Sequence, residues 1–475
     1  MPDTVTGRQR ARRLLAASAL AAMLGACSMA PDYSPPETAS VPAFKEVEGW
    51  TMASPGDAAP RADWWRTYGD PVLDGLEAQA QAASPTLAAA MARYDAAQAA
   101  VGEARADLFP TVSANASAAR TRLSRGRPQS TGRAVTYDDY IVGGGLSYEL
   151  DLWGRIRNRT RASAAEADAS EADLASAQLS LQASVADAYF RLRGLDAEAQ
   201  LLDQSVEAFS RAYDLTATRH DGGIASGIDV NRARTVLASA RALVAQNANR
   251  RAATEHELAA LTGSIASQFT LEDAPDAAWP RPLAAPVGTP SQLLERRPDI
   301  AAAERRVFAA NARIGVARAA WFPSLTLGTS GGWRSTRSDL ISTPNTFWGL
   351  GPIGSVLTLL DGGRRKAQVR MARADYEEVT ANYRETVLGA FREVEDAIAA
   401  LHHLKAEAVA QKDAATSAQR ISEIAMSRYR DGASDYLDVV TAQTDALSAK
   451  RALILVRTQR MQASVTLVRA LGGST

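Results

Sequence analysis

Few residues of this sequence have the types and spacing that catalysis or metal binding requires. The 475 residues include one cysteine and four histidines, so an intramolecular disulfide framework and a cysteine zinc site are both excluded. His402 and His403 are adjacent, and adjacent residues of a helix point in different directions, which argues against a shared metal. The sequence has no P-loop signature, no HExxH zinc motif and no serine-nucleophile elbow. We therefore expect no enzyme, no metal and no bound cofactor.

Cys27 is the one residue placed for covalent chemistry. Four arginines between positions 8 and 13 precede the short apolar run 14–24, and small residues stand directly before Cys27. This order predicts a lipoprotein signal peptide over residues 1–26; an ordinary signal sequence with a chance cysteine is the alternative. In a lipoprotein, Cys27 becomes the first residue and carries diacylglyceryl and N-acyl chains, which anchor it in a bilayer. Ser28 after the cysteine favours sorting to the outer membrane.

The composition narrows the class of protein further. Lys and Arg total 53 and Asp and Glu total 53, so net charge gives no support for nucleic-acid binding. Residues 27–62 are rich in Pro, Ala and polar residues, and we expect them to form an extended tether after the lipid. Beyond residue 26 the sequence contains no apolar stretch of about 18 residues, which a transmembrane helix needs. Any membrane crossing would have to be made by strands.

The remaining sequence is written twice. Residues 84–111 and 297–324 align at an offset of 213, and Arg219, Gly223 and Asp229 align with Arg428, Gly432 and Asp438 at an offset of 209. The order of segments is the same in both copies, which indicates one duplicated unit. We therefore predict a first repeat over 63–275, a linker over 276–295 and a second repeat over 296–475.

Long helices are expected in both repeats. Proline is absent from 129–274 and from 353 onward, and the helix-forming stretches break only at Asp221-Gly222-Gly223 and Asp431-Gly432. Glycine at such a break supplies the turn between antiparallel helices. The sequence thus predicts helix hairpins over 155–262 and 364–471, with first helices about 100 Å long. A seven-residue apolar repeat predicts coiled-coil packing, and it runs through Val440, Leu447, Ile454, Met461 and Val468; Arg251 breaks the matching series Val230, Leu237, Val244 and Leu258.

Each repeat also contains two predicted strands, near 109–121 and 138–152 and near 322–334 and 346–360. In 140–150, large apolar residues alternate with small or polar ones, a period typical of membrane strands with one face to lipid and one to a lumen. Four strands cannot close a barrel, and an open edge cannot exist in lipid. Several chains would share one barrel, and three chains would give twelve strands. A small soluble sheet that caps a helical bundle is the alternative.

Several spaced motifs resemble those of the TolC/OprM family of outer-membrane efflux channels, in particular its NodT-type lipoprotein branch. The motifs are the cysteine at position 27, Ser147-Tyr148-Glu149-Leu150-Asp151-Leu152-Trp153-Gly154-Arg155, Arg296-Arg297-Pro298-Asp299-Ile300, Ala319-Ala320-Trp321-Phe322-Pro323 and Leu360-Asp361-Gly362-Gly363-Arg364. The resemblance covers residues 60–475. It implies a mainly helical fold with membrane strands, in which three chains form a 12-stranded β-barrel on a 12-helix α-barrel.

The resemblance also implies a function. A homotrimer in the outer membrane would passively conduct drugs or other small molecules out of the periplasm, as the exit duct of a tripartite (RND-type) pump. Its partners would be a periplasmic adaptor protein and an inner-membrane transporter, which supplies the energy. The same channel could instead serve type I protein secretion, and a periplasmic coiled-coil scaffold lipoprotein is a third reading.

The resemblance places the gate at the glycine turns. Asp438 would face the lumen and form an acidic ring, and Asp229, Tyr429, Arg428 and Arg430 would hold the hairpins shut. The adaptor would contact the bare backbone at the turn glycines, namely Gly222, Gly223 and Gly432. Two positions depart from the family pattern: Thr441 stands where a second inner acid is usual, and Ser434 stands where an arginine is often found.

Overall fold

The computed structural model describes residues 28–37, 45, 63–128, 132–274, 279–282, 296–337 and 339–473. Cys27 and most of the predicted linker lie outside these residues. The helices are α2 (Pro71–Ala83), α3 (Pro85–Ala106), α4 (Arg155–Asp221), α5 (Gly227–Leu261), α7 (Pro298–Ala319), α8 (Arg364–Arg430) and α9 (Tyr436–Ala470). The strands are β1 (Thr111–Leu123), β2 (Val135–Leu150), β3 (Ser324–Ser335) and β4 (Thr346–Val356). Among the described residues there are also the short 3-10 helices η1 (Trp64–Tyr68), η2 (Ala266–Gln268) and η3 (Thr343–Asn345).

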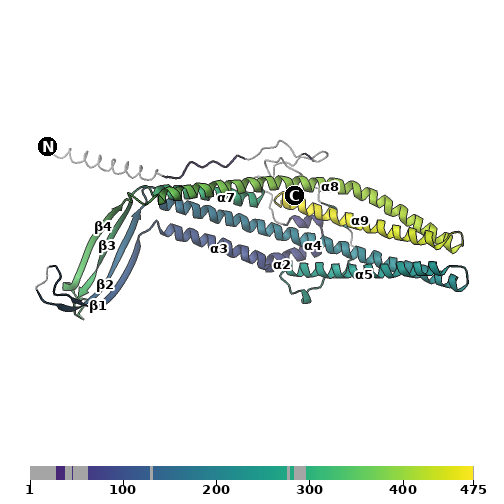
Figure 1. Cartoon of the computed structure of the whole chain (residues 1–475), viewed down its shortest axis with the longest axis horizontal. Coiled ribbons are helices and arrows are strands. Elements are labelled where there is room, and N and C mark those ends of the chain that lie inside the picture. Colours follow the sequence, from purple (N-terminus) through teal and green to yellow (C-terminus); the bar gives the residue numbers. More distant parts are fainter. Residues whose placement is uncertain are drawn as a thin grey trace, which may run out of the picture. The chain divides into compact units, whose positions relative to one another are not determined.

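The four strands form one antiparallel sheet in the order β1-β2-β3-β4 (Figure 1). All four expected strands are present; β2 begins at Val135, three residues before the expected start, and β4 ends at Val356, four residues before the expected end. The direct pair Val142 and Trp333 lies on one face, together with exposed apolar residues such as Trp348 and Leu350. The other face carries mainly Gly, Ser, Thr and Asn. The sheet therefore has one apolar face and one small, polar face, as the alternation predicted.

The two hairpins have equal dimensions. Helices α4 and α8 each have 67 residues, and α5 and α9 each have 35, so the offset of 209 holds along the whole of both hairpins. Gly194 of α4 lets α9 approach closely, because a Cβ there would lie 2.3 Å from the Thr458 hydroxyl oxygen. In the described part of the chain, no helix combines the length and apolarity needed to cross a membrane.

Each 67-residue helix begins at a motif that contains an aspartate. The Asp151 carboxylate accepts hydrogen bonds from the backbone N–H groups of Ile156 and Arg157, at 3.1 and 2.8 Å. The Asp361 carboxylate similarly accepts from Gly363 and Arg365, at 3.0 and 3.2 Å. These bonds satisfy backbone donors that the first turn of a helix leaves without partners. They explain why the chain changes from strand to helix at these two points.

Contacts divide the chain into two compact units, and each unit draws on both repeats. One unit contains 93–171 and 302–383, which include the whole sheet, and the other contains 172–301 and 384–475, which include both hairpin turns. The second unit has a core that includes Trp64, Trp65, Tyr189, Phe190 and Met461. A sequence repeat is therefore not a compact unit of this fold, because each repeat contributes strands to one unit and helices to both.

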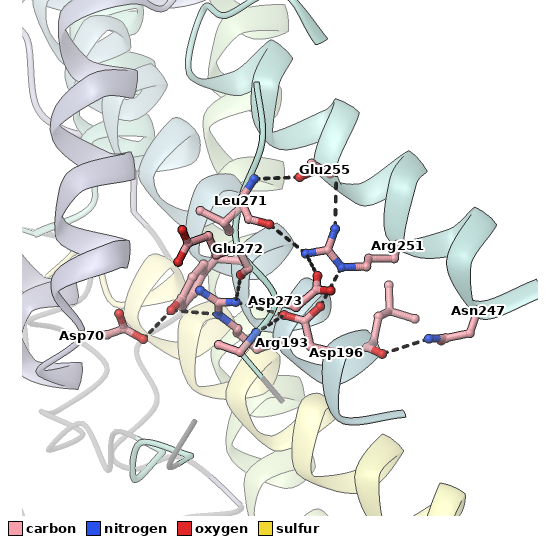
Figure 2. Close-up of polar contacts among 12 residues, drawn as sticks. Asp70, Arg193, Asp196, Asn247, Arg251, Glu255, Leu271, Glu272 and Asp273 are labelled. Carbon is pink, nitrogen blue, oxygen red and sulfur yellow. Dashed lines mark hydrogen bonds and ion pairs between the residues drawn. The ribbon is translucent and has the colours of Figure 1, made fainter. Parts of the chain in front are cut away.

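A polar network in the second unit fixes the segment after α5 to the α4–α5 hairpin (Figure 2). The Asp196 carboxylate, whose side chain is fully buried, accepts from Arg193 at 2.9 Å and from Arg251 at 2.7 Å. Both arginines continue to the backbone of the segment: Arg193 donates to the Glu272 carbonyl and Arg251 to the Leu271 carbonyl, each at 2.9 Å. Arg251 breaks the apolar repeat of α5 because it serves this network.

Candidate functional site at the hairpin turns

The two turns have the same backbone geometry. Gly223 and Gly432 both adopt the left-handed conformation, with φ of 72° and 76°. In the first turn the N–H of Ile224 donates to the Arg219 carbonyl, and in the second the N–H of Ala433 donates to the Arg428 carbonyl, both at 2.8 Å. This pattern is the common glycine end of a helix, in which any residue with a side chain would be strained. The glycines predicted to form the turns do so.

The two aspartates after the turns occupy equivalent positions in the first turn of α5 and α9 but differ in their contacts. Asp229 forms a capping box with Ser226, whose hydroxyl donates to the Asp229 carboxylate at 2.7 Å, and it lies 3.5 Å from Arg232. Asp438 donates its backbone N–H to the Asp435 carboxylate at 3.2 Å, and its own exposed carboxylate has no partner among the described residues. Asp438 is therefore free to face solvent or another chain, whereas Asp229 is committed to its own helix.

Tyr429 joins the two hairpins within one chain. Its side chain is 3% exposed. The Thr216 hydroxyl donates its proton to the Ala212 carbonyl, so it accepts the hydrogen bond from the Tyr429 hydroxyl, at 3.2 Å. The Arg219 guanidinium lies over the Tyr429 ring, 4.6 Å from its centroid, and donates to the Tyr429 carbonyl. We call Arg219, Thr216 and Tyr429 the latch.

The latch differs from the pairing expected from the sequence, which grouped Tyr429 with Asp229, Arg428 and Arg430. Arg428 donates to the carbonyl of Ala433 in its own turn at 3.4 Å, and Arg430 is exposed at the end of α8. Neither Thr216 nor Arg219 was among the predicted gate residues. Arg219 carried a signal, since it precedes its turn at the position equivalent to Arg428, but which arginine crosses between the hairpins depends on their packing.

Beside the latch lies a second aromatic ring. Tyr436 contacts Tyr429 edge to face, with 5.6 Å between ring centroids. Burial, with smaller contributions from Tyr429 and Asp229, raises the pKa of Tyr436 to about 12. The hydroxyl therefore stays protonated at neutral pH and adds no charge to the site. The groups that carry charge at the turns are the arginines and aspartates.

A shallow apolar groove of about 920 Å³ borders the first turn. It is lined by Ile228, Val236, Leu437 and Val440, together with polar residues at the start of α5. Ile228 is 65% exposed and Leu437 is 46% exposed. Large apolar side chains at a helix turn, left open to water, are typical of surfaces that contact another protein.

Comparison with known proteins agrees with this arrangement of sheet and hairpins. The family model described as "Outer membrane efflux protein" matches residues 76–264 and 289–473. The chain is 33% identical over 469 residues to the probable efflux pump outer membrane protein TtgC of Pseudomonas putida, which covers 97% of this chain and 96% of TtgC. It is 35% identical over 462 residues to the outer membrane protein OprJ of Pseudomonas aeruginosa, covering 96% of this chain and 94% of OprJ.

Solved structures show the same fold. The outer-membrane channel OprN superimposes with a TM-score of 0.87 at 31% identity, covering 94% of this chain and 99% of OprN. The CmeC outer membrane channel of Campylobacter jejuni gives a TM-score of 0.86 at 25% identity, covering 94% of this chain and 95% of CmeC. The matched residues include both hairpins and all four strands, and the chain belongs to the outer membrane efflux protein family.

Proposed function

We propose that this chain is the exit duct of a tripartite RND-type efflux pump and conducts small molecules passively from the periplasm across the outer membrane. The observation that carries this proposal is the pairing of a sheet that has one apolar and one small, polar face with two long antiparallel hairpins on the same chain. The sheet suits a membrane wall, and the hairpins suit a tube through the periplasm. The duct performs no chemistry, so the energy comes from the inner-membrane transporter.

Three copies of the chain form the channel. Strands β1 and β4 are the two edges of the sheet, and an open edge leaves backbone groups without partners in lipid. Edge residues on the apolar face are strongly exposed in the single chain, including Val112 at 76% and Trp348 at 85%. Pairing β1 of one copy with β4 of the next would close twelve strands around a lumen wide enough for solutes.

Purified protein in detergent tests this function directly. We expect a trimer by mass and a conducting pore after insertion into planar lipid bilayers. A compact monomer without conductance would contradict both the duct and the shared barrel. The acyl chains at Cys27 are a separate part of the proposal, and loss of palmitate labelling in Cys27→Ser would support them.

The hairpin turns form the periplasmic mouth, and Asp438 lines it. In a trimer three Asp438 carboxylates would lie around the axis, where their charge attracts cations and repels anions. We expect Asp438→Asn to lower the preference for potassium over chloride, measured as the reversal potential under a salt gradient. Asp431→Asn, an exposed change on the turn itself, is the control. An Asp438→Asn channel with the selectivity of the wild type would remove Asp438 from the pore lining.

The latch keeps the mouth narrow by holding the two hairpins of each chain together. Arg219→Ala removes the cation–π contact and the hydrogen bond to the Tyr429 carbonyl, together about 1–2 kcal/mol per chain. We expect an open population about tenfold higher for each chain, seen as larger single-channel conductance. Arg211→Ala, two turns earlier on α4 and 67% exposed, should leave the conductance unchanged. Equal conductance in both variants would show that the latch does not restrict the mouth.

The periplasmic adaptor contacts the same end of the molecule. The exposed backbone at Gly222, Gly223 and Gly432 leaves room for a close approach, and the apolar groove beside them offers Ile228 and Leu437. An adaptor that binds the open state of the mouth more tightly than the closed state would shift the equilibrium between them, by an amount set by the difference between the two affinities. Partner binding therefore favours the open state without any change in the covalent structure of the duct.

A further inference from the structure

The polar face of the sheet carries a glycine level near its outer end, the end away from the helices. Gly143, Gly332 and Phe347 are direct neighbours on three strands. A Cβ on Gly143 would lie 3.3 Å from the Phe347 ring and 2.8 Å from the Gly331 carbonyl oxygen. The ring of Phe347 therefore lies across the two glycines, against the sheet. At this level β2 and β3 present bare backbone and β4 presents the Phe347 ring, while Asn115 of β1 is the direct neighbour of Gly143.

One charged pair stands on the same face, closer to the outer end, with Arg334 one alternation beyond Gly332 and Asp139 two alternations beyond Gly143. Alternation along β2 puts Asp139 on the face of Gly143, and alternation along β3 puts Arg334 on the face of Gly332. The Arg334 guanidinium donates two hydrogen bonds to the Asp139 carboxylate, at 2.8 and 2.7 Å. The Asp139 side chain is 17% exposed and that of Arg334 is 59% exposed. The guanidinium is thus the more open of the two charges, and the carboxylate holds it in place.

The opposite face carries a matching pair at the same level. Arg120 of β1 and Asp138 of β2 are direct neighbours across the strands, and their charged groups lie 3.7 Å apart. Because Asp138 and Asp139 are consecutive strand residues, they point to opposite faces. The sheet therefore places one ion pair on its polar face and one on its apolar face, and the two aspartates are consecutive on β2.

We propose that Asp139 and Arg334 form a charge-balanced ring at the outer exit of the pore, where the pairing keeps the exit from selecting ions of either sign. This rests on the proposed trimeric duct, in which the polar face lines the lumen and three copies of the pair surround the exit. Asp139 neutralises Arg334, so the ring as a whole carries no net charge and passes solutes of either sign. The two glycines beneath the pair carry no side chains, so Asp139 and Arg334 are the charged side chains on this face that a solute meets beyond the glycine level.

Breaking the pair from either side gives opposite results. Asp139→Asn leaves three free guanidinium groups at the exit. We expect the reversal potential under a potassium chloride gradient to shift toward the equilibrium potential of chloride. Arg334→Gln leaves three free carboxylates, and we expect a shift toward that of potassium. The double variant restores a neutral ring, and its reversal potential should return to the wild-type value. Fixed charges in a narrow aqueous path select ions in this way.

The control uses the pair on the other face. Arg120→Gln removes a charge at the same level but on the apolar side, so its reversal potential should stay at the wild-type value. All variants are purified as trimers in detergent and inserted into planar bilayers. Each is also measured in the Arg219→Ala background. The wider mouth of that background reduces the part of the ion selectivity that is set at the periplasmic end. Single variants that shift in the same direction, or not at all, would overturn the ring. A shift confined to Arg120→Gln would show that the two faces are assigned the wrong way round.

Different results would contradict the proposed duct and the proposed ring. A wild-type protein that carries no current would contradict the duct itself, and the ring with it. Conducting wild-type trimers whose Asp139 and Arg334 variants keep the wild-type selectivity would leave the duct intact and reject the ring alone. A single variant that no longer forms trimers would show that the pair holds the barrel together. The double variant has no unpaired charge to prevent assembly, so its reversal potential then tests the ring.

Discussion

Asp196→Ala should strongly destabilise the α4–α5 hairpin. The Asp196 carboxylate is fully buried and pairs with Arg193 and Arg251, whose side chains are only 10% and 17% exposed. Without it, two nearly buried guanidinium groups lose their main counter-charge, which costs about 3–5 kcal/mol. The segment from Leu271 to Ala274 would also loosen, because both arginines and the Asp196 carboxylate hydrogen bond to its backbone.

Thermal unfolding and limited proteolysis of the purified protein measure the two effects. We expect a lower unfolding temperature and faster cleavage after Glu272 by a glutamate-specific protease. Lys405→Ala is the matched control, because Lys405 occupies the equivalent position of α8 and is exposed. It should change stability by no more than about 0.5 kcal/mol. If Asp196→Ala unfolds at the same temperature as Lys405→Ala, the network does not stabilise the fold.

Glu77→Met should stabilise the chain, and by an amount that depends on pH. Glu77 lies in α2 with none of its surface exposed, and neither carboxyl oxygen has a hydrogen-bond partner among the described residues. Burial, and to a lesser degree the Asp74 carboxylate, raises the pKa of Glu77 to about 9. The folded chain must therefore hold Glu77 protonated at neutral pH, whereas the unfolded chain ionises it near pH 4.3.

The direction of the pH effect follows from this difference. Because the folded pKa is the higher one, the contribution of Glu77 to the stability of the wild type is fully present below about pH 4 and is lost as the pH rises toward 9. At pH 7 the loss is on the order of 3 kcal/mol, since one pKa unit corresponds to about 1.4 kcal/mol. Methionine has a similar shape and no ionisable group, so the variant avoids the loss. Its advantage should be small at pH 5 and several-fold larger at pH 8.

Unfolding temperatures of wild type and Glu77→Met at pH 5 and pH 8 check this prediction. Glu207→Met is the control, because Glu207 is 73% exposed on α4 and its change should bring no pH-dependent difference. A Glu77→Met variant that is less stable than the wild type at pH 8 would mean that Glu77 has a charged or hydrogen-bonded partner in the assembled protein.

The sequence alone determined the type and order of the secondary structure. Period-two alternation in 140–150 and proline-free runs of helix formers are local properties, so the sheet and the long hairpins could be predicted within a few residues of their ends. The turns were equally local, because Gly223 and Gly432 are needed wherever a helix ends in the left-handed conformation. Because the sequence is duplicated, the two hairpins could also be predicted to have equal lengths.

Only the tertiary structure decided which charges meet. Arg219 reaches Tyr429 across 210 residues of sequence, Arg251 reaches Asp196 across 55, and Arg334 reaches Asp139 across 195. The sequence marks each of these residues as charged, and for Arg251 as a break in an apolar repeat, but it does not give a partner. Pairing depends on the rotation and register of packed helices and strands, which many weak contacts set together. Local pattern fixes the elements of this protein, whereas the partners of its charges follow from packing.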